Sequence, residues 1–161
     1  MVGKRWWTVM EFGEFDALVL RTREGLRTQD YPEGFFPFDS WRSSEEEIER
    51  VEQELDVRLP GQYKEFMVRH GGGAFLFVDL LPVVAPGPRA EDLVSVNRDS
   101  LRETGFLAVA PVGTGDWWGF TLTGTECDEA VDLRSHDDGL REREAPGFLD
   151  FLVRHGLGCD S

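Results

Sequence analysis

The sequence predicts an α+β fold, in which helices pack against a twisted, mostly antiparallel sheet. Two features of the chain favour this class. Short apolar runs separated by tight turns, the pattern of hairpins, fill its second half, and amphipathic helical patterns precede and follow them. The 161 residues, 40% hydrophobic and 12% aromatic, are enough for one domain with a substantial core.

The first 43 residues are expected to form a strand and loop extension that packs on this core. Two strand-like runs within residues 6–22, WWTVM and DALVLRT, are separated by the turn-prone segment 11–14 and predict a hairpin. Residues 23–43 are rich in proline and glycine and predict a loop. We expect its aromatic residues to fold back onto the core, since exposed they would be a sticky patch: Phe35, Phe36, Phe38 and Trp41.

Residues 44–70 predict two helices joined by a Leu-Pro hinge. Ser44 and Glu47 have the spacing of a capping box at the start of the first helix. Pro60 ends that helix before the hinge and is expected in the first turn of the second. Glycines 71–73 provide a left-handed stop. The apolar stripe of the two helices predicts the face that covers the sheet: Ile48, Val51, Leu55, Tyr63, Phe66 and Met67.

The remaining elements are short. A helix with an irregular end is expected over 91–103, and Pro146 is expected in the first turn of a last helix. Residues 158–161 are expected to form a tail. Strands are expected over 74–78, 106–112, 117–123 and 130–133.

The formal net charge of −14 is the strongest signal in the composition. Residues 113–140 contain seven acidic residues against one base, Arg134, so this short region holds almost half of the net charge. Such a field repels phosphate backbones, which argues against direct nucleic-acid binding, and it attracts a basic protein partner. The alternative is that acidic loops only keep the protein soluble, and composition alone favours this alternative.

No catalytic, cofactor or metal site is predicted. The RHG triplets at 69–71 and 154–156 match a histidine-phosphatase motif, but both end predicted helices, where a cation and a glycine form ordinary caps. The adjacent side chains 136–138 make a poor metal-ligand set. Cys127 and Cys159 have no metal or redox spacing, as is usual in a reducing cytoplasm. No apolar run reaches the roughly 18 residues of a membrane span.

Trp117 and Trp118 are the ambiguous pair. Successive residues of a strand point to opposite faces, so one tryptophan is expected in the core and the other outside it. The outward side chain, next to Asp116, either packs under a loop or anchors a partner, and the sequence leaves both possibilities open.

The order of these patterns resembles the SMI1/KNR4 (SUKH) superfamily, whose core is a glutamate-rich helix, a Leu-Pro pair, an aromatic helix and a glycine pair. The resemblance continues through FLAVAPVGTGDWWG at 106–119 and closes with a helix over 148–155, so that it covers about residues 44–157. One departure is His70-Gly71, where the family often has asparagine before its glycines. The matching residues are Ile48, Glu52, Leu55, Leu59, Pro60, Tyr63, Phe66, Gly72 and Gly73.

The resemblance implies a non-catalytic, cytoplasmic, protein-binding module. Bacterial members are commonly immunity proteins, which bind a cognate toxin domain, often a nuclease, and block it. A regulatory adaptor without a toxin partner is the alternative, as in eukaryotic relatives; a small hydrolase is a more distant third. With a basic toxin domain as the partner, the expected contacts are Asp116, Trp117, Trp118, Glu126, Asp128, Glu129, Asp137 and Asp138.

Overall fold

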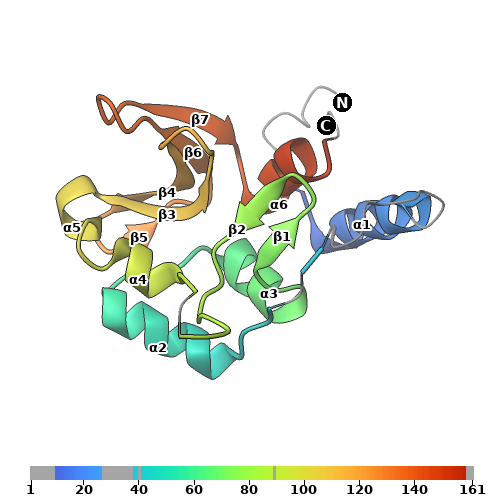
Figure 1. The fold of residues 1–161 in the computed structure, drawn as a ribbon, viewed down its shortest axis with the longest axis horizontal. Helices are drawn as coiled ribbons and strands as arrows, with labels where there is room; N and C mark the ends of the chain where they lie inside the picture. The colour runs from blue at the N-terminus through green and yellow to red at the C-terminus, as the bar shows by residue number, and fades with distance from the viewer. Residues whose placement is uncertain (1–9, 27–37, 40, 89, 159–161) are drawn as a thin grey trace.

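Antiparallel strands form the main layer of the protein, which confirms the α+β class (Figure 1). The computed structural model describes residues 10–26, 38–39, 41–88 and 90–158. In the five-stranded sheet the order is β3-β4-β6-β7, and β5 pairs with β4; β1 and β2 form a separate two-stranded sheet. The strands are β1 Gly73–Phe75, β2 Val78–Leu80, β3 Phe106–Pro111, β4 Trp117–Thr123, β5 Glu126–Cys127, β6 Val131–Arg134 and β7 Arg141–Ala145.

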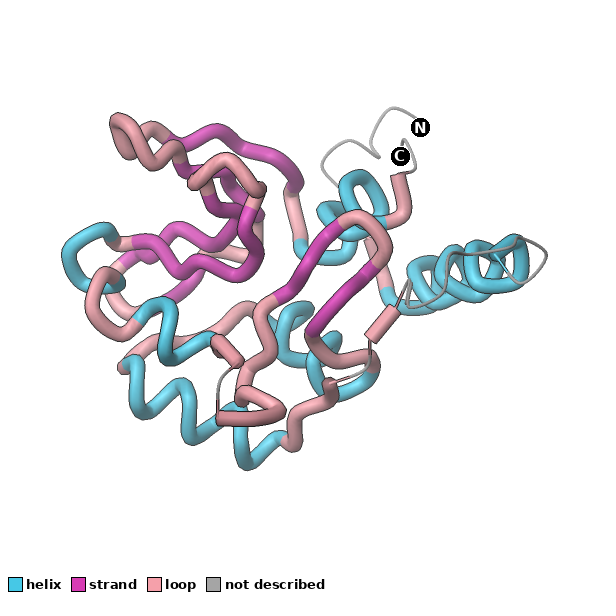
Figure 2. Tube along the Cα trace, viewed as in Figure 1, coloured by secondary structure: helices cyan, strands magenta, loops and turns pink. Residues whose placement is uncertain are grey.

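The helices lie around one side of these strands, as Figure 2 shows in cyan. In Figure 1, α2 and α4 lie below the sheet, α3 and α6 lie at the centre, and α1 lies at the side far from the sheet. The helices are α1 Phe12–Leu26, α2 Glu45–Leu55, α3 Gly61–Arg69, α4 Leu93–Asn97, α5 Leu101–Thr104 and α6 Phe148–Phe151, which continues into the π-helical segment η2 Leu152–Gly156.

The predicted helix pair is confirmed as α2 and α3. The Ser44 hydroxyl accepts from the Glu47 backbone N–H at 3.1 Å, and the Glu47 carboxylate accepts from the Ser44 N–H at 2.9 Å, which completes the capping box. Pro60 stands one residue earlier than expected, at the cap of α3 rather than in its first turn. Gly71, with φ of +91°, follows the end of α3 as the predicted stop.

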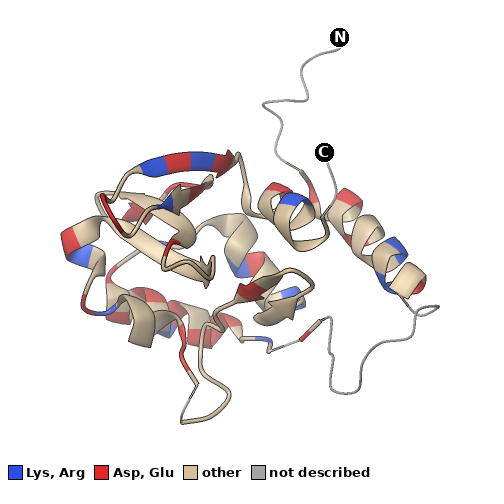
Figure 3. Ribbon diagram, turned by 45° about the horizontal axis from the view of Figure 1, so that its top comes forward, with Lys and Arg blue, Asp and Glu red and all other residues tan. Residues whose placement is uncertain are grey.

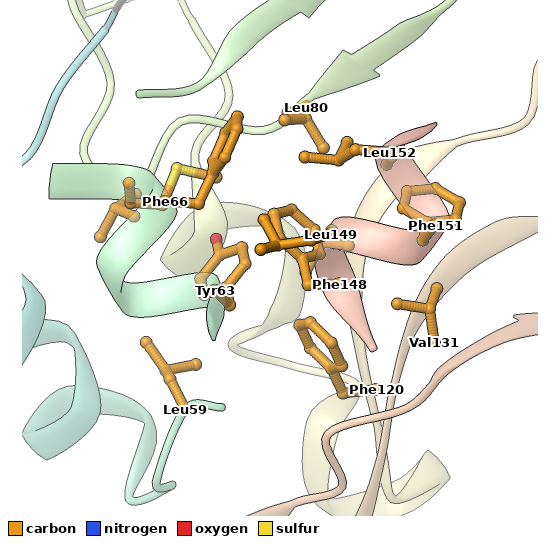
Figure 4. Packing of buried hydrophobic residues seen from close by; sticks show 14 of the residues in the cluster. Leu59, Tyr63, Phe66, Leu80, Phe120, Val131, Phe148, Leu149, Phe151 and Leu152 are labelled. Carbon is orange, nitrogen blue, oxygen red and sulfur yellow. The ribbon is translucent and has the colours of Figure 1, made fainter. Parts of the chain in front are cut away.

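The core lies where α3 and α6 meet β4 (Figure 4). The Tyr63 ring makes edge contacts with Phe148 at 5.1 Å and with Phe120 at 5.5 Å between centroids. All six residues of the predicted stripe are buried, with at most 5% of their surface exposed. Burial of this stripe explains why two short helices with many charges are stable here.

The hairpin predicted within residues 6–22 is wrong in the described part, because residues 12–26 form the helix α1. Phe15 and Val19 are buried, and their spacing of four residues is that of one helix face. The segment contains alanine, leucine, arginine and glutamate, which favour helices, and a short apolar run does not distinguish a strand from a helix.

The aromatic residues that follow α1 are only partly described. Phe38 packs on the Phe75 ring at 5.2 Å and so folds onto the core as expected. The backbone of Trp41 pairs with Gly72, but 41% of the tryptophan surface is exposed. Phe35 and Phe36 lie outside the described residues.

Four later elements differ from the predictions. The single strand expected over 74–78 is a hairpin, β1–β2, that turns at Leu76 with φ of +51°, a turn without a glycine or asparagine signal. The helix expected over 91–103 is two helices, α4 and α5. Pro146 precedes the last helix, which is capped by Gly147. Strand β7 was not expected, because its sequence REREA has few β-forming residues.

Candidate protein-binding surface

Trp118 is the inward member of the tryptophan pair at the start of β4. Its ring lies 5.2 Å from Phe151 and 5.1 Å from His155, and its indole N–H is buried without a hydrogen-bond partner among the described residues. Trp117 therefore points to the opposite face of the sheet, where it is half-buried. Neither tryptophan ring is fully exposed. The pair therefore offers a partner less aromatic surface than a fully exposed tryptophan would.

Asp116 is held by the turn that joins β6 to β7. One oxygen of its carboxylate accepts from the backbone N–H of His136 at 2.9 Å and lies 2.6 Å from the Nδ1 atom of the same residue. These hydrogen bonds lower the pKa of Asp116, and the carboxylate in turn raises the pKa of His136. The pair ties two hairpin turns together.

Asp137 and Asp138 lie in the same turn. The Asp137 side chain is 82% exposed, and its carboxylate lies 3.1 Å from Nε2 of His136. The Asp138 carboxylate accepts from the backbone N–H of Leu140 at 3.0 Å. We call Asp116, Asp137 and Asp138 the hairpin cluster.

The other three predicted acids lie near the helices. Glu126 lies 3.9 Å from the guanidinium of Arg58, and Asp128 accepts from the hydroxyl of Thr123 at 3.1 Å. Glu129 accepts from the backbone N–H of Gly61 at 3.2 Å, at the first residue of α3. A carboxylate is stabilised there by the positive end of the helix dipole.

The predicted site is therefore divided between the two ends of β4. The hairpin cluster lies beside Trp117, the first residue of the strand, and Glu126 pairs with Thr123, the last. A strand of seven residues is about 20 Å long, which is beyond the Debye length of about 8 Å at physiological salt. The two groups of acids act as separate surfaces.

A denser acidic segment is α2, which is absent from the contact residues predicted from the sequence. Residues 45–56 contain seven acidic side chains and one base, the balance of region 113–140 in less than half its length (Figure 3). A count of charge per residue, rather than per region, would have found it.

A groove of about 440 Å³ separates α2 from α3. Its apolar lining is Val68, which is half-buried, and Ile48, which is only 3% exposed. Glu49 and Glu65 stand exposed on its two sides. Its one cation, Lys64, lies 3.4 Å from the carboxylate of Glu52. The groove is lined by Glu45, Ile48, Glu49, Glu52, Gly61, Lys64, Glu65 and Val68.

Residues 45–152 match the model of the SMI1-KNR4 cell-wall family, which is about two thirds of the chain. The chain belongs to this family. Its members are generally non-catalytic immunity or binding proteins. The SMI1-KNR4 match begins at the first residue of α2 and ends within the last helix, so it contains the groove, both acidic groups and the whole main sheet. No curated protein sequence matches the chain.

Other chemistry on this SMI1-KNR4 domain is limited. Across the described residues, no three histidine, cysteine or acidic side chains are placed to hold a metal ion. Burial raises the pKa of the Cys127 thiol to about 12, so this sulfur stays protonated at neutral pH. Cys159 lies outside the described residues. None of the described helices is both long and apolar enough to cross a membrane.

Proposed function

We propose that this chain is a cytoplasmic immunity protein that binds a cognate toxin domain and blocks it stoichiometrically. The observation that carries the proposal is the acidic surface of an SMI1-KNR4 domain: a net charge of −14, with acids concentrated on α2 and at both ends of β4. The partner is then a basic domain, such as a nuclease whose substrate-binding face carries positive charge.

The acidic residues predicted from the sequence have a defined role in this proposal. Asp137 and Asp138 project from the hairpin and attract the partner over long distances, which raises the association rate. Glu126, Asp128 and Glu129 extend the acidic surface of α2 toward the sheet. Trp117 lies beside the hairpin cluster as apolar surface.

Co-expression tests the proposal directly. The probe is the C-terminal domain of a large secreted protein encoded beside this gene, expressed with and without the chain. We expect wild type to restore growth and to form a one-to-one complex whose association slows steeply with added salt. Unchanged toxicity and no complex, with both proteins folded, would contradict an immunity function.

A regulatory adaptor is the second candidate, favoured by the description of the family as cell-wall proteins. An adaptor predicts no toxin gene beside this one and no protection in co-expression. Deletion of the gene would then change sensitivity to cell-wall stress in the absence of any competing strain, whereas loss of an immunity protein harms the cell only when the toxin is present.

A further inference from the structure

The groove between α2 and α3 differs from the other acidic surfaces because it combines charge with apolar surface. Val68 of α3 gives it partly exposed apolar surface beside the buried Ile48 of α2, and Glu45, Glu49, Glu52 and Glu65 surround them. Lys64 is the one cation among the described residues that line it. Glu45 and Glu49 have no hydrogen-bond or ion-pair partner within the described part of the chain. Two full negative charges are therefore available to a ligand.

We infer that this groove is the docking site for a basic segment of the partner, in which lysine or arginine side chains flank an aliphatic side chain. The inference rests on the proposed function and names the surface that carries it. The aliphatic side chain contacts Val68. The flanking cations pair with Glu45 and Glu49 on one side and, on the other, with Glu65, whose carboxylate lies 3.1 Å from the Arg69 guanidinium in the free protein. Apolar contact supplies affinity, and the carboxylates supply selectivity.

Charge also decides against other occupants. A second copy of this chain would bring another protein of charge −14 against an acidic groove, and a nucleic acid would bring phosphates. A cation without apolar surface would leave the exposed part of Val68 uncovered. A basic protein segment satisfies both the carboxylates and the apolar surface.

Lys64 occupies the place that a partner cation would take. Its amino group lies 3.4 Å from the Glu52 carboxylate, which also accepts from the Leu59 backbone N–H at 2.8 Å. Glu52 is thus already satisfied, and the positive charge of Lys64 opposes an incoming cation. Removing this charge should strengthen partner binding.

Two double variants with equal charge test the site in the complex with the neighbouring toxin domain. Glu49→Gln with Glu65→Gln changes the groove, and Asp137→Asn with Asp138→Asn changes the hairpin cluster; each pair changes the net charge from −14 to −12. We expect the groove pair to weaken binding about tenfold or more and to speed dissociation, while the hairpin pair only slows association, by about threefold or less. Lys64→Gln should bind faster than wild type.

Equal effects of the two pairs, or Lys64→Gln binding more slowly than wild type, would overturn the groove assignment while leaving the immunity function intact. Failure of wild type to bind any neighbouring toxin would instead overturn the function. A second probe then judges the groove alone: a synthetic amphipathic helix of repeated Leu-Lys-Lys-Leu units, titrated into the labelled protein and followed by NMR. The largest shifts should fall on Glu49, Lys64 and Val68. No binding, or largest shifts over 135–140, would contradict the inference.

Discussion

Asn97 is a buried polar side chain that joins α4 to the main sheet. Its amide group donates to the backbone oxygens of Leu93 and Ala108, both at 2.9 Å, and its side-chain oxygen accepts from the Ala108 N–H at 2.8 Å. The side chain is 1% exposed. It therefore pairs with β3 as a neighbouring strand would, at the bulge between Ala108 and Ala110.

Asn97→Ala should lower the free energy of unfolding by at least about 2 kcal/mol, because both backbone groups of Ala108 would be left buried without partners. Urea unfolding measures the effect. The control is Ser95→Ala, which removes an exposed capping bond of the same helix, where the Ser95 hydroxyl accepts from the Asp92 backbone N–H. If Asn97→Ala lowered the free energy of unfolding no more than Ser95→Ala does, water would have replaced the hydrogen bonds of the Asn97 amide.

The histidines His70 and His136 should titrate on opposite sides of the ordinary pKa of 6.5. Burial lowers the pKa of His70 despite its contact with Asp16, whereas the carboxylate of Asp116 raises the pKa of His136. Protonation of His70 thus favours unfolding as the pH falls. The stability that His136 contributes is complete below pH 6.5 and is lost as the pH rises through its folded pKa.

NMR titration of the imidazole protons measures both values. The difference in melting temperature between wild type and His136→Ala should also shrink as the pH rises above the ordinary histidine pKa of 6.5. A His136 pKa at or below that of His70 would show that the pair with Asp116 does not persist in solution.

At the scale of elements, the predictable parts were those with strong local signals. The capping box at Ser44, the apolar stripe of α2 and α3, and the span of β4 are all as predicted. The misses have weak or misleading signals: Leu76 turns without a glycine, and β7 is a strand of alternating charges held by its register with β6. Tertiary pairing decides such segments.

The site was harder to predict than the fold. Region 113–140 is one segment of sequence, but β4 separates its acids into two groups, and no local pattern gives that distance. The α2–α3 groove contains charged residues from two helices. In the sequence, these helices lie far from most of the predicted contact residues. Only the helix packing brings Glu49 and Glu65 to one groove.

The packing of α2 and α3 should carry much of the stability. Leu55→Ala and Phe66→Ala should each cost about 2–5 kcal/mol, because these side chains are 5% and 0% exposed and leave cavities. Asp137→Ala and Asp138→Ala should change stability by no more than about 0.5 kcal/mol. Urea melts of the four variants compare them. If the acidic pair cost as much as the core pair, the hairpin turn would be structural.

At the scale of the whole molecule, α1 extends the domain beyond the 45–152 family match. Phe15 is fully buried against Phe66 and Phe75, with ring centroids 6.0 and 5.9 Å apart, and Asp16 pairs with Arg69 and His70. These contacts attach α1 to α3 and to the β1–β2 hairpin.

Phe15→Ala should therefore destabilise the whole protein by about 3–5 kcal/mol in a single transition. Leu20→Ala, on the exposed side of the same helix, is the control and should have little effect. Fluorescence of the tryptophans and circular dichroism should report the same midpoint. Two separate transitions would mean that α1 unfolds independently of the family domain.

Strand β7 has a consequence for self-assembly. Its charged residues alternate in sign along the strand, as the colours of Figure 3 show. Side chains of a strand alternate with the same period of two, so Arg141 and Arg143 lie on one face of the sheet and Glu142 on the other. When two copies of a strand pair antiparallel about a two-fold axis, the residues opposite each other have the same parity. Every such register of β7 with itself therefore places arginine against arginine or glutamate against glutamate. This edge strand of the sheet therefore resists growing into a ribbon of identical chains, and the irregularity in its pairing with β6, which leaves Glu144 without an opposite residue, opposes such growth further.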